Sequence, residues 1–359
     1  MGQTTTRSPL VLVSGRVRTD FQISDDLAPR QDYLEIAHAV NGELLGYSNS
    51  IGTWNQWVRR LQKRLRLDLV ESMSAASLAS KHSVLLSLSE RIAIPLAVMF
   101  QLSGKSVPHI VIGHKLSSGF KAQLFLKTQL HHTFAHLIVR CQAQADYAVN
   151  ELKMPESRVH FIPGKVDERF YRPLDLDDGG YVLSVGQEQR DYRTLIQALS
   201  KTGLKLIIVA SSPSSRSLIE LDGAADSDVK VLSHVPYPEL RALYAQARLV
   251  AVPMYEADYA AGVSSIVEAM AMAKPIVLTR TSGILDYIED HETGVYVMSQ
   301  NPDELRDTIL SLWHNAQERN RLGTNARQAV EERMTLDSYV NRIAQIVHQT
   351  LAESQAQPA

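Results

Sequence analysis

The sequence predicts an α/β fold divided into two domains. Buried strand patterns alternate with helical patterns in both halves of the chain, an order that produces parallel sheets with helical crossovers. A chain of 359 residues is long enough for two domains of ordinary size, each with its own core. A loop-like, proline-bounded stretch, 164–173, separates the halves. We therefore expect domains over residues 1–167 and 174–335, followed by a C-terminal helix and tail over 336–359.

Composition narrows the class of protein. The formal net charge of −2 gives no global reason to expect a nucleic-acid partner. The single cysteine, Cys141, cannot form an intramolecular disulfide, which fits a reducing compartment. The apolar run 10–13 is too short for a signal peptide, and the run 92–100 is too short to span a bilayer. We expect a cytoplasmic protein.

The first strand, helix and second strand predict a βαβ unit. Residues 9–14 (PLVLVS) read as a buried strand, and Gly15 opens the polar loop that follows it. The segment 32–40 has the apolar spacing of a helix, and 43–47 is the next strand. This order implies a parallel sheet.

A basic segment, 51–69, has the pattern of an amphipathic helix. Its apolar face carries Trp54, Trp57, Leu61 and Leu65. Its cations cluster nearby and are Arg59, Arg60, Lys63, Arg64 and Arg66. One interpretation is a helix that lies on an anionic membrane, which would make the protein peripheral. The other is an ordinary amphipathic helix with a solvated charged face.

The remaining strands of the first half place two polar residues at a strand end. Strands are predicted over 83–88, 108–113, 135–140 and 158–163, with helices over 90–102 and 142–152. His114 and Lys115 directly follow the second of these strands, and ligands of parallel sheets bind at the carboxyl ends of strands. The histidines His131, His132 and His136 lack a nearby carboxylate or cysteine that would complete a metal site, so we expect structural roles and no metal.

The second half opens with a strand over 181–185 and a polar turn, Gly186–Arg193, that leads into a helix over 194–200. Further strands are predicted over 204–210 and 229–232, and a helix over 240–247. The last helices are expected over 302–313, 315–333 and 337–351.

The stretch 248–279 carries the chemistry. A strand, 248–253, is followed by a loop, by Gly262, and by Ser264 and Ser265, which can cap a helix over 265–273. The free N–H groups and the dipole of such a helix attract an anion above Gly262. Glu268 lies four residues after Ser264, on the same helix face, where it can reach hydroxyls attached to that anion. This combination suits the diphosphate and ribose of a nucleotide sugar.

The residues from Gly262 to Pro275, with Gly283 and the run Asp290–Gly294, resemble the donor-site signature of glycosyltransferase family 4. The resemblance implies the GT-B fold, in which two doubly wound Rossmann-like domains face a cleft and the last helix returns to the first domain. It also implies a retaining reaction. The similarity is specific over the second domain and loose over the first.

In that family a pair of glutamates brackets the glycine turn. The second matches Glu268, which by resemblance holds the donor's ribose. The first falls on Ala260, so either Asp258 or Glu256 replaces it, or the backbone N–H groups of 261–264 hold the transferred sugar. We favour the backbone groups, including those of Val263 and its neighbours, because small residues let a ligand approach closely.

The resemblance also assigns the other donor contacts. Arg190 takes the place of the family's phosphate-binding lysine, Gln187 stands where its arginine is usual, and Arg193 is the alternative cation. The opposing interpretation of Arg190 is an ordinary surface arginine. Val235 and Tyr237 precede the helix that cups the nucleobase in relatives.

The first domain supplies the acceptor side. His114 matches the family histidine that contacts the transferred sugar or the acceptor; the alternative is a histidine satisfied within its loop. Lys115 and Gly15 are the other acceptor-side candidates, although Gly15 stands alone where the family has a glycine-rich turn.

We therefore expect a glycosyl group to pass from a nucleotide-diphosphate sugar to a hydroxyl of a lipid, polysaccharide or glycoside. UDP is the first expectation for the nucleotide and GDP the second, from family frequency. Arg190, the Gly262 turn and the helix at Ser264 would stabilise the leaving diphosphate, with no metal or cofactor.

Two other functions use similar folds. A nucleotide-sugar epimerase would share the donor site but has no use for a basic, tryptophan-bearing helix. A dinucleotide-dependent oxidoreductase needs a G-x-G-x-x-G turn, which neither 14–16 nor 185–187 supplies.

Overall fold

The computed structural model describes residues 7–17, 26–48, 56–65, 67–104, 107–117, 119–210 and 228–356. The chain forms two compact units. Unit 1 comprises Met1–Gln22, Gln31–Ile162 and Asp337–Ala359, and unit 2 comprises Ile23–Arg30 and Pro163–Leu336. The crossing after Ile162 lies a few residues before the predicted boundary at 167, and the short segment 26–30 belongs to the second unit.

Unit 1 is built on a parallel sheet of six strands in the order β2-β1-β3-β4-β5-β6. Its strands are β1 (Leu10–Leu12), β2 (Glu43–Leu45), β3 (Leu85–Ser87), β4 (His109–Gly113), β5 (His136–Val139) and β6 (Val159–Phe161). Strand order reverses at β1, as in doubly wound sheets. The predicted parallel sheet of the first half is confirmed.

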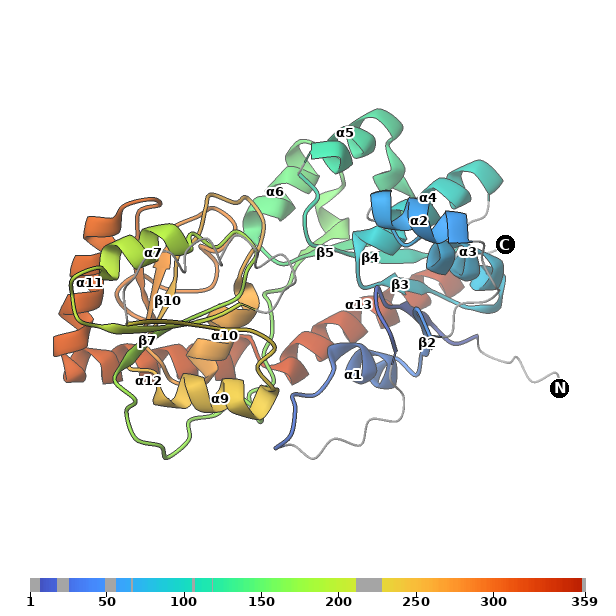
Figure 1. Ribbon diagram of the computed structural model, residues 1–359. Coiled ribbons are helices and arrows are strands. Elements are labelled where there is room, and N and C mark those ends of the chain that lie inside the picture. The colour runs from blue at the N-terminus through green and yellow to red at the C-terminus, as the bar shows by residue number, and fades with distance from the viewer. Residues whose placement is uncertain are drawn as a thin grey trace. The chain divides into compact units, whose positions relative to one another are not determined.

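Helices cover both faces of this sheet. They are α1 (Asp32–Ala39), α2 (Gln56–Leu65), α3 (Leu69–Leu78), α4 (Glu90–Ser103), α5 (Gly119–Thr128), α6 (Gln142–Asn150) and α13 (Leu336–Ala356). Three short 3₁₀ turns lie at Ala79–Lys81, Leu130–Thr133 and Glu156–Arg158. Figure 1 shows α1 and α13 on one face of the sheet and α3 to α6 toward the other.

The predicted helix 51–69 is wrong in its extent. Within the described residues it is α2, which ends at Leu65, and a second, unpredicted helix, α3, begins at Leu69. The break has a cause in α4, where Pro95 has no N–H for the carbonyl of Arg91. The Asp68 N–H donates to that carbonyl (2.9 Å), so the chain between α2 and α3 is held on α4.

Unit 2 has a second parallel sheet of six strands, in the order β12-β11-β10-β7-β8-β9. Its strands are β7 (Tyr181–Val185), β8 (Lys205–Val209), β9 (Val229–Leu232), β10 (Leu249–Val252), β11 (Ile276–Thr279) and β12 (Val295–Val297). Its helices are α7 (Tyr192–Leu199), α9 (Tyr237–Gln246), α10 (Val263–Ala271), α11 (Pro302–His314) and α12 (Ala316–Arg333). The two parallel-sheet domains predicted from the sequence are confirmed.

The central strands β7, β10 and β11 of unit 2 are buried on both faces. Leu183 and Val250 pack with α9, α10 and α12, whereas the next residues along the strands, Val182 and Ala251, pack with α7 and α11. Figure 1 shows these two groups of helices on opposite sides of β7 and β10. Strand order reverses between β7 and β10, and ligands of such sheets bind at the carboxyl ends of the strands flanking that point. No helix within the described ranges is long and apolar enough to cross a membrane.

Candidate functional site

The loops that follow β7 and β10 are joined to each other. The Asp191 N–H donates to the carbonyl of Pro253 (3.1 Å), and the Tyr255 N–H donates to the carbonyl of Gln189 (2.9 Å). Between them, Arg190 and Met254 form an isolated antiparallel bridge. These bonds fix one continuous surface at the carboxyl ends of two neighbouring strands.

Two glycines let this surface form. Gly186, at the end of β7, has φ +108° and Gly262, before α10, has φ +76°, values that disfavour any side chain. A Cβ at Gly186 would lie 2.7 Å from Nη2 of Arg190, and one at Gly262 would lie 2.5 Å from Nη1. The guanidinium of Arg190 therefore fills the space that these glycines leave.

Arg190 is buried, and its five N–H groups all have protein acceptors. Its Nε donates to the carbonyl of Val185 (3.1 Å), which also accepts from Nη2 (2.9 Å). The other acceptors are the carbonyl of Glu188 (3.2 Å), Sδ of Met254 (2.7 Å) and Oγ of Ser265. Arg190 therefore braces the two turns, and its contact with phosphate stays a prediction. Arg193, in the first turn of α7, is the exposed cation of this loop.

The start of α10 differs from the serine-capped helix expected. Gly262 is the N-cap, with no side-chain cap bond. The Ser265 hydroxyl is buried, donates to the carbonyl of Gly262 (2.9 Å) and accepts from Arg190, so it supports the turn. Val263 is buried too, whereas Ser264 is exposed. The first-turn N–H groups have no acceptor within the helix, so an anion here would meet the backbone of 263–265 and the hydroxyl of Ser264.

The residues before Gly262 include the candidates to replace the family's first glutamate, which is Ala260 in this chain. The Ala261 N–H, one of the groups expected to hold the sugar, donates to the carbonyl of Tyr259 (2.6 Å) and is occupied. Ala260 is half-buried against the core. Glu256 is exposed and accepts from the Ser282 N–H (3.3 Å). Replacement by Asp258 or Glu256, or by the N–H groups of 262–264, stays a prediction.

Glu268 is half-buried on α10 and accepts a hydrogen bond from the Tyr244 hydroxyl (2.9 Å). Burial raises the pKa of its carboxyl from 4.5 to about 7, against the hydrogen bonding of tyrosines and the charge of Arg190, which lower it. The carboxyl therefore gains or loses its proton near neutral pH. Its assignment to ribose stays a prediction.

The nucleobase candidates lie where α9 begins. Tyr237 is the first residue of the helix, not part of a preceding loop, and 46% of it is exposed. Its ring meets that of Phe170 edge-on at 6.3 Å, and Val235 is half-buried beneath. Burial and the charge of Glu268 raise the pKa of Tyr237.

In unit 1, His114 and Lys115 are held by a buried carboxylate. The N–H groups of both donate to Glu90 at 3.1 Å, and Lys121 Nζ donates to the same carboxylate at 2.7 Å. His114 Nε2 donates to the carbonyl of Leu88 (3.0 Å), and its Nδ1 faces Nη1 of Arg140 at 3.4 Å. A carbonyl only accepts, so His114 donates to Leu88 from Nε2.

Gly15 lies at the end of β1, where it takes part in backbone hydrogen bonds with Val13 (2.9 Å) and Tyr47 (2.8 Å). Beside it, a buried Asp68 accepts from Ser14, from the Tyr47 hydroxyl (2.9 Å) and from Arg91 (2.9 Å). Sequence reasoning missed Asp68 because it fell inside the predicted helix.

Within the described ranges, no three His, Cys, Asp or Glu residues are grouped to hold a metal ion. His131 is buried against the rings of Phe125 and His132, and His136 bonds to His160 (2.9 Å). These contacts belong to the core of unit 1.

Two further tyrosines beside Glu268 were also missed. Tyr244 had a signal, since it lies seven residues after Tyr237 and so on the same helix face. Tyr171 had none, because it lies in the irregular connector 163–173 and only the tertiary structure brings it to α10.

Comparison with known proteins agrees with this geometry. The family described as "Glycosyl transferases group 1" matches residues 171–329. The alpha-D-kanosaminyltransferase of Streptomyces kanamyceticus is 24% identical over 339 residues, which cover 86% of this chain and 86% of that protein. The D-inositol 3-phosphate glycosyltransferase of Paenarthrobacter aurescens is 25% identical over 239 residues, 57% of each chain.

Solved structures share the fold. Sucrose-phosphate synthase from Thermosynechococcus elongatus has a TM-score of 0.74 at 15% identity, over 97% of this chain and 100% of that one. The Anabaena protein HepE, solved in complex with UDP and glucose, has a TM-score of 0.71 at 15% identity, over 95% and 99%. With its two six-stranded parallel sheets, the chain has the expected GT-B fold. These findings do not favour the epimerase.

Proposed function

We propose that this chain is a group 1 glycosyltransferase, the family whose model matches residues 171–329, and that it carries out a retaining reaction with a UDP-sugar. The sugar would pass to an acceptor hydroxyl with its anomeric configuration kept, as the resemblance to family 4 implies. GDP is the second choice of nucleotide.

One observation carries the proposal. The N-terminus of α10 opens at the reversal point between β7 and β10, and Glu268 lies one turn deeper on the same helix. The free N–H groups and the helix dipole favour a diphosphate at Ser264. The carboxylate of Glu268 can then accept from the hydroxyls of a ribose joined to that diphosphate. A single helix therefore carries the groups proposed to bind the diphosphate and the group proposed to bind the ribose.

The chain's own residues would act on the leaving diphosphate by electrostatics. The N–H groups at the start of α10 donate to it, and Arg193 approaches from the loop after β7. Arg190 contributes its charge from beneath the Gly262 turn, since its N–H groups are already bonded to protein acceptors. Donors fixed before the reaction stabilise developing negative charge without reorganisation.

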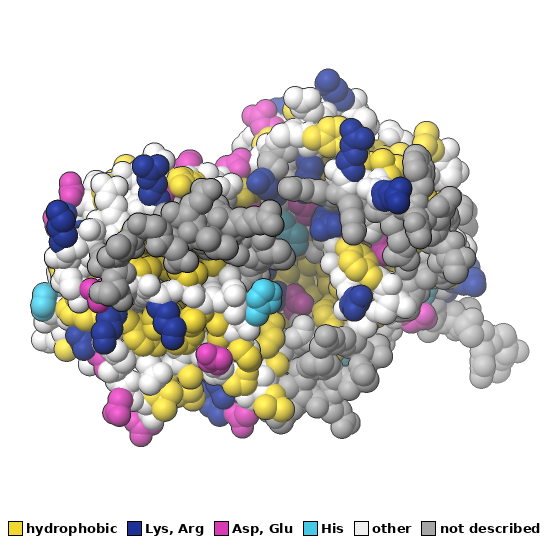
Figure 2. Space-filling view, viewed as in Figure 1, with side chains coloured by type: hydrophobic (Ala, Val, Ile, Leu, Met, Phe, Trp, Pro, Cys, Tyr) yellow, Lys and Arg dark blue, Asp and Glu magenta, His cyan; other side chains and the backbone are white. Residues whose placement is uncertain are grey.

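For the donor, support comes from HepE, whose structures hold UDP and UDP-glucose. For the acceptor, support comes from the charge of unit 1. Asp68 and Glu90 are buried in ion pairs, whereas their partners Arg91 and Lys121 remain 42% and 26% exposed. Figure 2 shows Lys and Arg side chains on the surface of unit 1 around α2 and α5. We propose an acceptor that carries a negative group near its reactive hydroxyl.

The test is incubation with a panel of UDP- and GDP-sugars, with release of nucleotide as the readout. Slow hydrolysis of one UDP-sugar, faster with added acceptor, is the expected result, and NMR of the product should show the donor's anomeric configuration. An inverted product rejects the retaining mechanism, and an isomerised nucleotide sugar identifies an epimerase.

A further inference from the structure

The carboxyl group of Glu268 interacts electrostatically with four polar side chains from three segments of unit 2. They are Arg190 before α7, Tyr237 and Tyr244 on α9, and Tyr171 in the connector 163–173. Of these, the Tyr244 hydroxyl donates directly to Oε2 at 2.9 Å. Tyr237 is the most exposed of these four residues, at 46%.

Tyr171 is the unexplained member of this group. It is only 2% exposed, and its hydroxyl makes no direct hydrogen bond among the described residues, although its interaction with Glu268 lowers the pKa of that carboxyl. Its ring packs edge-on against Phe170 at 4.9 Å and Tyr244 at 6.1 Å. Tyr244 in turn donates to Glu268, and the charge of Glu268 adds to burial in raising the pKa of Tyr171. A buried hydroxyl without a partner is costly, which calls for a role.

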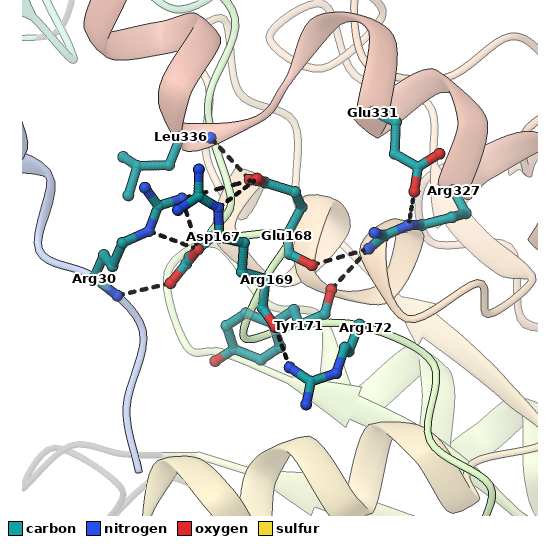
Figure 3. A network of polar contacts seen from close by, with 9 residues as sticks. All are labelled: Arg30, Asp167, Glu168, Arg169, Tyr171, Arg172, Arg327, Glu331 and Leu336. Carbon is teal, nitrogen blue, oxygen red and sulfur yellow. Dashed lines mark hydrogen bonds and ion pairs between the residues drawn. The ribbon is translucent and has the colours of Figure 1, made fainter. Parts of the chain in front are cut away.

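The backbone of Tyr171 is fixed to the helix that carries Glu268. Nη1 of Arg327 donates to the carbonyls of Tyr171 (2.9 Å), Ala271 (2.8 Å) and Glu168 (3.3 Å). Ala271 lies three residues after Glu268 on α10. Figure 3 shows Arg327 reaching Tyr171 and Glu168. A single guanidinium therefore sets the position of the connector against α10.

Asp167 and Glu168, which precede Tyr171 in the connector, are also bonded to other segments. Arg30 binds the buried carboxylate of Asp167 through its backbone N–H (2.8 Å), Nε (3.1 Å) and Nη2 (3.0 Å). The Leu336 N–H donates to Glu168 (3.3 Å). Figure 3 shows these contacts meeting at 167–168.

We propose that Tyr171 and Tyr244 are positioning residues that together hold the ionised carboxylate of Glu268 for the donor. Tyr244 orients one oxygen, and Tyr171 donates its unpartnered hydroxyl when the carboxyl loses its proton. The free lone pairs then point to the ligand. This inference rests on the proposed donor site for its consequence, but the contact itself exists without any donor.

The contact is tested first without ligand, by ¹³C NMR of protein labelled at the glutamate δ-carbons, with Glu268→Gln identifying the resonance. The wild-type midpoint is expected near pH 7. Tyr171→Phe and Tyr244→Phe should each raise it by about one pH unit, because each removes a donor to the ionised form. The control is Tyr296→Phe, a buried tyrosine whose hydroxyl donates to the carbonyl of Ile284 (3.0 Å) and which should leave the midpoint unchanged.

Titration with UDP then measures the consequence. At pH 7 the two phenylalanine variants should bind UDP about fivefold more weakly, because fewer molecules carry the ionised carboxylate, and binding should recover at pH 9. A purely structural defect would not be rescued by pH. Unmoved midpoints in both variants would overturn the inference. Moved midpoints without UDP binding by the wild type would uphold the contact and reject UDP as the donor nucleotide.

Discussion

At the scale of single residues, the candidate site contains two charged groups that differ in burial and hydrogen bonding. Arg190 is buried and fully bonded, so its charge is fixed and its contacts are internal. Glu268 is half-buried and its carboxyl titrates near neutral pH. The first group shapes the site, and the second can respond to a ligand.

Glu268→Ala should weaken nucleotide binding by roughly ten- to a hundredfold. A hydrogen bond to a charged group contributes about 1.5–3 kcal/mol, and about 1.4 kcal/mol is a factor of ten in affinity. Titration calorimetry with UDP measures the loss. Glu239→Ala, an exposed glutamate on α9, is the matched control. Equal affinity of Glu268→Ala and the wild type would remove Glu268 from the site.

Glu268→Gln should change how stability depends on pH. In the wild type the folded pKa is about 7 and the ordinary value is 4.5, so the folded state holds the proton more tightly. Stability from this group is greatest below pH 4.5 and is lost as pH rises through 7, by at most about 3 kcal/mol. Glutamine cannot ionise, so the variant does not lose this stability. Urea denaturation should show its free energy of unfolding rising relative to that of the wild type between pH 5 and pH 8. A constant difference between the two proteins would contradict the raised pKa.

Arg190→Ala should lower both turnover and stability. Loss of its charge beneath the leaving group is expected to cost on the order of a hundredfold in kcat. Loss of five hydrogen bonds to buried groups is expected to lower the free energy of unfolding by about 3 kcal/mol. The comparison is Arg193→Ala, which should lower kcat and leave urea denaturation unchanged. Wild-type turnover in Arg190→Ala would assign the electrostatics to backbone groups and Arg193.

At the scale of elements, the role of a helix such as α2 or α10 depends on the residues that pack against it. The N-terminus of α10 is open for the proposed anion because Gly262 allows the turn and Arg190 supports it. For α2, Arg60 and Arg64 are exposed and one turn apart, and Gln62 bonds to Glu71 of α3 (3.1 Å). The side chains of Trp57, Arg59 and Lys63 lie outside the described residues, as do Trp54 and Arg66.

If the basic segment 51–69 lies on anionic membranes, the protein should sediment with phosphatidylserine vesicles, and less so at high salt. Changing Arg60, Lys63 and Arg64 to glutamate should abolish this, because each cation near the surface contributes about 1 kcal/mol. Since Gln62 still holds α2 on α3, melting should not change.

The matched control for the vesicle experiment carries the same charge change on unit 2. It replaces Lys201, Lys205 and Lys230, all exposed, with glutamate. This variant should still sediment. Equal loss in both triple variants would mean that net charge, not α2, governs binding, and no sedimentation of the wild type would leave α2 a solvated helix.

At the scale of the whole molecule, the chain passes between its two units four times: before Ile23, after Arg30, after Ile162 and after Leu336. Three of the segments that cross are tied together within unit 2 by Arg30, Asp167, Glu168 and Leu336 (Figure 3). The same unit holds the donor residues, so its stability and its site depend on contacts between segments far apart in sequence.

Arg30→Ala should lower the free energy of unfolding by about 3 kcal/mol, because it leaves the buried carboxylate of Asp167 without a cation. Denaturant titration measures the change. Arg306→Ala, which removes exposed ion pairs with Asp303 and Asp307, is the control and should unfold like the wild type. Equal stability of the two variants would show that the network does not stabilise unit 2.

The sequence by itself determined the two parallel sheets and the presence of a helix after Gly262, but not which residue caps it. Strand and helix periodicity are local properties of the chain, and Gly262 before a run of helix formers is a local signal for a turn and a helix N-terminus. The same local logic placed Glu268 one turn below Ser264. Local sequence signals did not predict where the basic helix ends, since nothing in 51–69 shows that it ends at Leu65.

Only the tertiary structure decided what the polar groups bond to. Arg190 was expected to face a phosphate, but the Gly186 and Gly262 turns, far apart in sequence, close around its guanidinium. Tyr171 came to Glu268 because Arg327 binds the connector and α10 together. The hydrogen-bond partner of a buried polar group depends on which segments pack together in the folded chain. A buried donor bonds to an acceptor that lies within about 3 Å of it, because an unpaired buried donor is costly. Sequence spacing does not record that distance.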